Sequence, residues 1–201
     1  MPRSIHSIGP IPGVDISLDV YVDEAKINQA KELISRMPEI ETIAYRKGTV
    51  NFGKMLARYV RKCITTNTPP PGVSWPPHSD DYLRNYDVKG FWYLSGQMLR
   101  SIRVREYNGN RFYVGPDPGE AAIAPVNKKG RSHSSSLTLI QLARMLELGS
   151  TAQYNEEGVQ NTHNDIPARP LFRPSFKAVG GTERLKRYII ANLRREIQKA
   201  L

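Results

Sequence analysis

The sequence predicts an α+β fold: a small antiparallel sheet packed by three or four helices, with long proline-rich loops and an N-terminal arm. Three observations carry this prediction. Apolar and polar residues alternate strictly from Val14 to Val22, the period of a strand with one buried face. An Asn-Gly pair at 108–109 separates two short runs, which predicts a hairpin. Several longer stretches repeat apolar residues every three or four positions, as amphipathic helices do.

The 201 residues are enough for one domain with a real core. We expect a mobile arm at 1–12 and a single domain at 13–201. Fifteen prolines and fifteen glycines gather mainly in irregular stretches, at 1–13, 69–77, 115–130 and 167–181. No apolar run approaches the roughly 18 residues that a membrane span needs. We therefore expect a soluble protein that is made in a cytoplasm, with no membrane partner.

Helix signals divide the first third of the chain into three pieces. Asp23 is placed to cap a helix that Pro38 interrupts, a weaker helical stretch follows up to Gly48, and Asn51 is placed to cap a third helix through about Thr66. Trp75, in the loop that follows, is expected to anchor on the core, because so large an apolar ring is poorly tolerated in water. The strand at 14–22 is expected to pair with the hairpin.

The stretch from Leu137 to Phe176 organises the rest. A helix is expected over 136–148, with Ser135 or Ser136 as its cap and Gly149 as its stop. The run 166–176 holds three prolines, so we expect neither a helix nor a central strand there. A last helix is predicted from Thr182 to the C-terminus.

Candidate chemistry is sparse. His78 and His163 each stand near an aspartate, which raises the alternative of a metal-dependent nuclease, but both lie in separate loops without helical spacing. The simpler interpretation is that they are solvated turn residues. Cys63, the one cysteine, lies on an apolar helical stripe and is interpreted as a small buried hydrophobe. We expect no enzyme, no catalytic residue, no metal and no cofactor.

The formal charge of +10 favours a polyanion or an acidic protein surface as partner. One cluster is the loop triplet Lys128, Lys129 and Arg131, and another is the helix face with Arg58, Arg61 and Lys62. Either cluster could meet phosphates, so a basic nucleic-acid-binding accessory protein is the alternative function. Solvated faces are the simpler interpretation, because the aromatic residues that single-strand binders interleave are missing.

Four ordered segments resemble tail-completion and neck proteins of tailed bacteriophages, the virion-morphogenesis type included. Their sequences are Gly72-Val-Ser-Trp-Pro-Pro77, Trp92-Tyr-Leu-Ser-Gly-Gln-Met-Leu-Arg-Ser-Ile102, Met145-Leu-Glu-Leu-Gly-Ser150 and Ile166-Pro-Ala-Arg-Pro-Leu-Phe-Arg-Pro-Ser-Phe176. They are similar to the family's Trp-x-Pro loop, its step into a hairpin, its Glu-x-Gly-Thr segment and its Ile-Pro-Ala-Arg-Pro segment. The resemblance covers roughly residues 50–200. Ser150 stands where the family has Thr, and Leu171-Phe172 where it has Phe-Leu.

The resemblance implies a structural virion protein of the head–tail junction, a neck, tail-completion or tail-terminator protein assembled in the host cytoplasm. It would form a homo-oligomeric ring, commonly six-fold, between the head connector and the tail-tube or terminator protein. DNA would pass through without sequence-specific binding, and most Lys and Arg side chains would face the adjacent rings. The expected assembly-interface residues are Glu147, Gly149, Arg169, Pro170, Phe172, Arg173, Lys128, Lys129 and Arg131. Arg169 and Arg173 would bind carboxylates, such as Glu147 or one on a neighbour, or would tether the segment within the chain.

Overall fold

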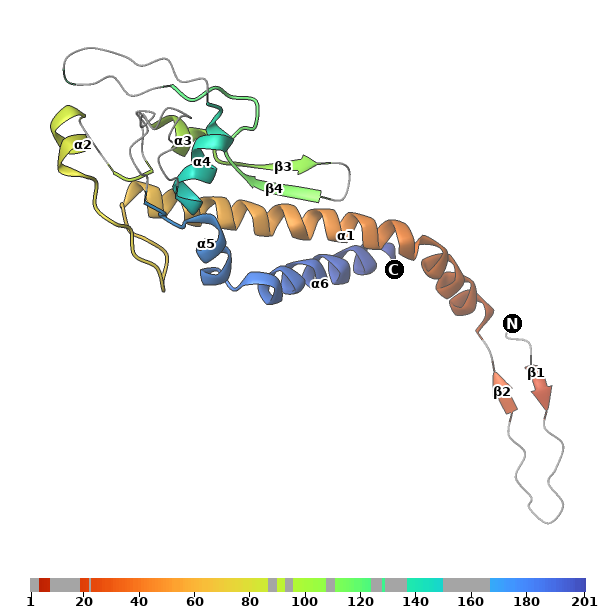
Figure 1. Ribbon diagram of the computed structural model, residues 1–201. Helices are drawn as coiled ribbons and strands as arrows, with labels where there is room; N and C mark the ends of the chain where they lie inside the picture. Colours follow the sequence, from red (N-terminus) through yellow and green to blue (C-terminus); the bar gives the residue numbers. More distant parts are fainter. Residues whose placement is uncertain are drawn as a thin grey trace, which may run out of the picture. The chain divides into compact units, whose positions relative to one another are not determined.

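A computed structural model of the chain describes residues 4–7, 19–21, 23–86, 90–92, 96–107, 111–123, 128, 137–149 and 167–201 (Figure 1). In order, its elements are β1 (Ser4–Ser7), β2 (Asp19–Tyr21), α1 (Glu24–Thr65), α2 (Asp80–Asn85), α3 (Gln97–Ser101), β3 (Arg103–Tyr107), β4 (Arg111–Gly115), α4 (Leu139–Leu148), α5 (Phe172–Ala178) and α6 (Gly181–Ala200). The mixture of helices with antiparallel strand pairs is α+β in the broad sense. The chain divides into two compact units, Met1–Lys47 with Ile189–Leu201, and Gly48–Tyr188.

Helix α1 is continuous over 42 residues, so the predicted breaks at Pro38 and before Asn51 are wrong. Asp23 does begin it: its Oδ1 accepts hydrogen bonds from the amides of Ala25 and Lys26. A proline inside a helix costs about 3 kcal/mol. Buried Ile40 and Ala44 follow Pro38 on the same helix, and burying side chains of that kind contributes an amount comparable with the cost of the proline.

The strands form two separate two-stranded sheets in the described part of the chain, rather than the single sheet expected. β3 and β4 pair antiparallel from Arg103 opposite Gly115 to Tyr107 opposite Arg111, which confirms the two predicted hairpin strands. Only residues 19–21 of the predicted 14–22 strand are described. They pair with β1, inside the predicted arm, and not with the hairpin. The predicted Asn-Gly turn between β3 and β4, at 108–110, lies outside the described residues.

The core of the second unit forms where α1 meets the hairpin, α4, α5 and the loops around two tryptophans. Its largest fully buried side chains include Trp92, Met98, Ile102, Leu139 and Leu171. Gly53 permits the close approach of α1 to the hairpin, because a Cβ there would lie 2.9 Å from Val104 Cγ1. Cys63 is buried in this core, as predicted. Burial raises the pKa of its thiol.

The N-cap of helix α4 lies two residues after Ser136, the later of its two predicted caps. Thr138, rather than Ser135 or Ser136, is the N-cap: its hydroxyl accepts from the Gln141 amide, and the Gln141 side chain accepts from the Thr138 amide. This reciprocal pair is a capping box. Gly149 stops the helix with φ of 79°, a conformation that favours glycine. Leu139, Ala143 and Leu146 face the core, as their spacing predicted.

Candidate docking site at the junction of α4 and α5

Glu147, near the end of α4, holds the start of α5. Its carboxylate accepts hydrogen bonds from three successive amides, Leu171 at 2.6 Å, Phe172 at 3.0 Å and Arg173 at 3.2 Å. The first amides of a helix have no partner inside it, and they carry the positive end of the helix dipole. A half-buried carboxylate from another element therefore does here what a capping residue usually does from within the same segment.

Helix α5 overturns the prediction that its proline excludes a helix. Pro174 is the third residue of α5, where an amide would have no acceptor inside the helix, so the missing N–H costs nothing. The next amide, that of Ser175, makes the first intrahelical bond, to the Leu171 carbonyl. Glu147, Pro174 and this bond together account for every amide in the first turn.

Arg169 is buried, with 3 % of its surface exposed. Its guanidinium donates to the carbonyls of Pro76 at 3.1 Å and Pro77 at 3.2 Å, and it stacks over the ring of Phe91. Burial lowers the pKa of this group, and in the described part of the chain it has no carboxylate partner. The expected contact between Arg169 and the Glu147 carboxylate does not form, because that carboxylate binds the amides at the start of α5. Of the two roles considered for Arg169, the tether within the chain is the one observed.

Two tryptophans hydrogen-bond to the backbone of the same segment. The indole of Trp75 donates to the Pro170 carbonyl at 2.9 Å, and that of Trp92 donates to the Arg169 carbonyl at 3.2 Å. The Arg169 amide donates to the Leu146 carbonyl at 2.7 Å. Trp75 is 8 % exposed, which confirms it as an anchor on the core. The four segments that carry the family resemblance thus meet at residues 169–172.

His78 is part of an aromatic stack, so the interpretation of it as a solvated turn residue is wrong. Its ring lies 4.9 Å from that of Tyr82 and 4.7 Å from that of Phe91, nearly parallel to both. The Nε2 atom is buried without a hydrogen-bond partner. Burial, and next the nearby charge of Arg169, lower the pKa of His78.

A groove lies beside the capped end of α5. It has a volume of about 700 Å³ and is lined mainly by apolar surface: Pro71, Gly72, Val73, Glu147, Leu148, Pro170, Arg173, Pro174, Lys177 and Ala178. Leu148 at its edge is 67 % exposed, a high value for so large an apolar side chain. Arg173 and Lys177, four residues apart on α5, are also exposed. Neither makes a salt bridge within the described residues.

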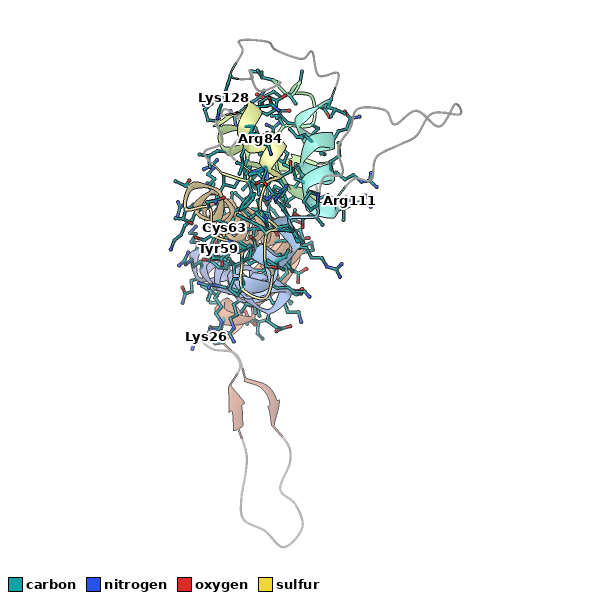
Figure 2. The ribbon with its side chains drawn as sticks, turned by 60° about the vertical axis from the view of Figure 1, so that its left-hand side comes forward. Lys26, Tyr59, Cys63, Arg84, Arg111 and Lys128 are labelled. Carbon is teal, nitrogen blue, oxygen red and sulfur yellow. The ribbon has the colours of Figure 1, made fainter. Side chains whose placement is uncertain are left out.

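The predicted interface residues do not all lie together. Glu147, Pro170 and Arg173 line the groove, with Gly149 directly after Leu148, whereas Phe172 packs edge-on against Trp92 in the core. Lys128 lies beside the end of α2, near Arg84 in Figure 2, where its amide donates to the Asn85 carbonyl and its ammonium to the Leu83 carbonyl. Lys129 and Arg131 lie outside the described residues.

The predicted basic residues of α1 are exposed except for Arg61, which binds within the chain. Lys54, Arg58 and Lys62 are exposed at successive intervals of four residues. Arg61 instead turns inward and donates to the carbonyl of Ile102. Tyr59 and Cys63, labelled in Figure 2, lie one turn apart on the same helix, and Cys63 is buried.

Across the described residues, no three His, Cys, Asp or Glu side chains gather where they could hold a metal ion, and His163 is outside that part. No described helix is both long and apolar enough to span a bilayer.

Sequence reasoning did not find Gln97, which organises a buried polar cluster. Its amide donates to the Glu120 carboxylate and the Ala121 carbonyl and accepts from the Ile123 amide, each at 2.8 Å. A lone glutamine at the start of a helix gives no sequence signal for such a role. These bonds hold the segment 120–123 against the start of α3. The Leu139 amide donates to the Glu120 carbonyl and joins the same segment to the start of α4.

Comparisons with known proteins add no relative: no family model, curated protein or solved structure matches this chain.

Proposed function

We propose that this chain is a structural protein of a phage head–tail junction, which works as a homo-oligomeric ring between the head connector and the tail. The observation that supports it best is the interlocking of the four resembling segments around residues 169–172. Residues that are far apart in the sequence form one rigid junction, so the ordered set of motifs has a common physical reason.

The groove beside this junction is suited to docking another chain. A ring closes when one surface of each subunit docks on a different surface of the next. An apolar groove with two exposed cations and an exposed leucine on its edge is suited to receive a segment from another chain. The proposed function depends on binding energy and on shape complementarity, and it requires no catalysis.

Electron microscopy of particles assembled without this chain tests the proposal. We expect heads and tails that fail to join, or tails of irregular length, and restoration of whole particles when the wild-type chain is supplied. Normal infectious particles in its absence would rule out the proposed role.

A basic nucleic-acid-binding accessory protein remains the second candidate, because Lys54, Arg58 and Lys62 form an exposed row on α1. Non-specific binders have dissociation constants of roughly 10⁻⁴ to 10⁻⁶ M at physiological salt, with a steep salt dependence. Submicromolar DNA binding that weakens when all three residues are changed to Gln would favour this candidate. Weak binding that is equal for wild type and the triple variant would exclude it.

A further inference from the structure

We infer that the groove receives the N-terminal part of α1 from a second copy of this chain. We call residues 23–41 the acidic stretch. The inference rests on the proposed function in taking the groove as a docking surface, and it adds the identity of the occupant. The inferred contact joins two copies of the chain.

The acidic stretch has little packing: Ile40 is its one buried side chain, and Leu33 and Met37 are half-buried. None of the residues from Asp23 to Glu39 is buried. Isolated helices are marginal in water, and in proteins their stability comes mostly from packing an apolar face. A helix of 42 residues whose first 16 bury no side chain therefore has an apolar face without a partner in the described part of the chain.

The exposed apolar face is a row on one side of the helix. Ile34 is 68 % exposed and Ile27 is 39 % exposed, and seven residues bring them nearly into line. Gln29, whose side chain donates to the Leu201 carbonyl at the end of α6, lies on roughly the opposite side. The contact with α6 therefore leaves the isoleucine row uncovered.

Charge identifies the second copy as the occupant. The chain as a whole carries +10, but the acidic stretch has five acidic residues against three basic ones. In the described structure Glu24, Glu32, Glu39 and Glu41 form no salt bridge, and Arg173 and Lys177 at the groove form none either. The groove has one carboxylate, Glu147, which the amides at the start of α5 already bind, and two exposed cations without such partners. An acidic helix with an isoleucine row complements these two cations and the apolar walls.

The arrangement suits a ring because the two surfaces differ. The stretch belongs to one compact unit and the groove to the other, so each copy has one of each to offer. Docking of the acidic stretch of one copy into the groove of the next is then a heterologous contact, the kind that closes rings. A helix presenting residues at intervals of seven to an apolar groove is a common recognition mode.

Two variants with one defect each test the inference. Ile34→Asp places a charge on the row, and Leu148→Asp places one on the edge of the groove. Both side chains are about two-thirds exposed, so the fold should tolerate either change. Ile123→Asp, at a site 63 % exposed and outside the groove, is the matched control. The masses of wild type, each variant and mixtures are measured by sedimentation velocity, with circular dichroism to verify folding.

We expect wild type and Ile123→Asp to form the same oligomer, and each of the other two variants to be a monomer. An equal mixture of those two should form a dimer and nothing larger, because only one intact stretch and one intact groove can meet. A monomeric wild type, an unaltered oligomer in either single variant, or a mixture that stays monomeric or grows beyond the dimer would overturn the inference. Those results leave the electron-microscopy test of the proposed function standing, so the two can fail separately.

Discussion

Glu147 shows how a single side chain stabilises a segment that has little regular structure of its own. Three amides converge on its carboxylate, and a proline follows where a fourth amide would go unpaired. Hydrogen bonds to a charged group contribute more to stability than bonds between neutral groups do. The Glu-x-Gly and Ala-Arg-Pro segments are therefore one structural feature, joined through this residue.

Glu147→Ala is expected to lower the free energy of unfolding by about 2–4 kcal/mol, because it leaves these amides without their acceptor. Urea denaturation at neutral pH measures the effect. Gln198→Ala, at an exposed position of α6 outside both proposed surfaces, is the control and should change stability by less than about 0.5 kcal/mol. Equal midpoints for Glu147→Ala and wild type would show that the amides find other partners.

His78 should make stability depend on pH. Its pKa in the folded chain is lowered by burial and by Arg169, while the unfolded value is about 6.5. The unfolded state therefore binds the proton more readily, and the stability contributed above pH ~6.5 is lost as the pH falls toward the folded pKa. Tyr82 and Phe91 stack on the ring and offer the cation no carboxylate.

His78→Phe keeps a ring in the stack and removes the titration. We expect the urea midpoint of wild type to fall from pH ~7.5 to pH ~5.5 by more than that of the variant, the other histidines being common to both. The variant should be at least as stable as wild type at neutral pH, since it also removes the unpaired Nε2. Parallel pH profiles would contradict the assigned role.

Among the helices and strands, the sequence pattern predicted the elements that depend on nearby residues and missed those that depend on distant contacts. The hairpin strands, α4 and α6 follow from Asn-Gly turn chemistry, apolar spacing and capping residues. The continuity of α1 through Pro38 and the existence of α5 do not, because packing on the core and the distant Glu147 carboxylate determine them. In the same way, Arg169 could be singled out from sequence, but its partners in the Trp75 loop could not.

The two helix prolines should differ sharply in their effect on stability. Pro38→Ala restores an amide inside α1 and removes a clash with the preceding turn, so it should raise the unfolding free energy by about 1–3 kcal/mol. Pro174→Ala is the matched control, at a first-turn position where the proline costs no hydrogen bond, and should be within about 0.5 kcal/mol of wild type. Thermal unfolding followed by circular dichroism compares them. A destabilised Pro38→Ala would mean that α1 needs the proline where it is.

For the whole molecule, the distribution of charge matters more than its sum. The chain has an excess of ten positive charges, yet it places an acidic, apolar helix in one unit and an apolar groove with two cations in the other. If the stretch docks in the groove as inferred above, these are the two different surfaces that head-to-tail assembly requires. Its binding energy would then come from contacts between copies rather than from a bound small molecule.

Native mass spectrometry of the purified wild-type chain at micromolar concentration tests this central claim most directly. We expect one closed oligomer larger than a dimer, with six copies as the expected number and no open-ended series of masses. A chain that stays monomeric or dimeric under these conditions would contradict it.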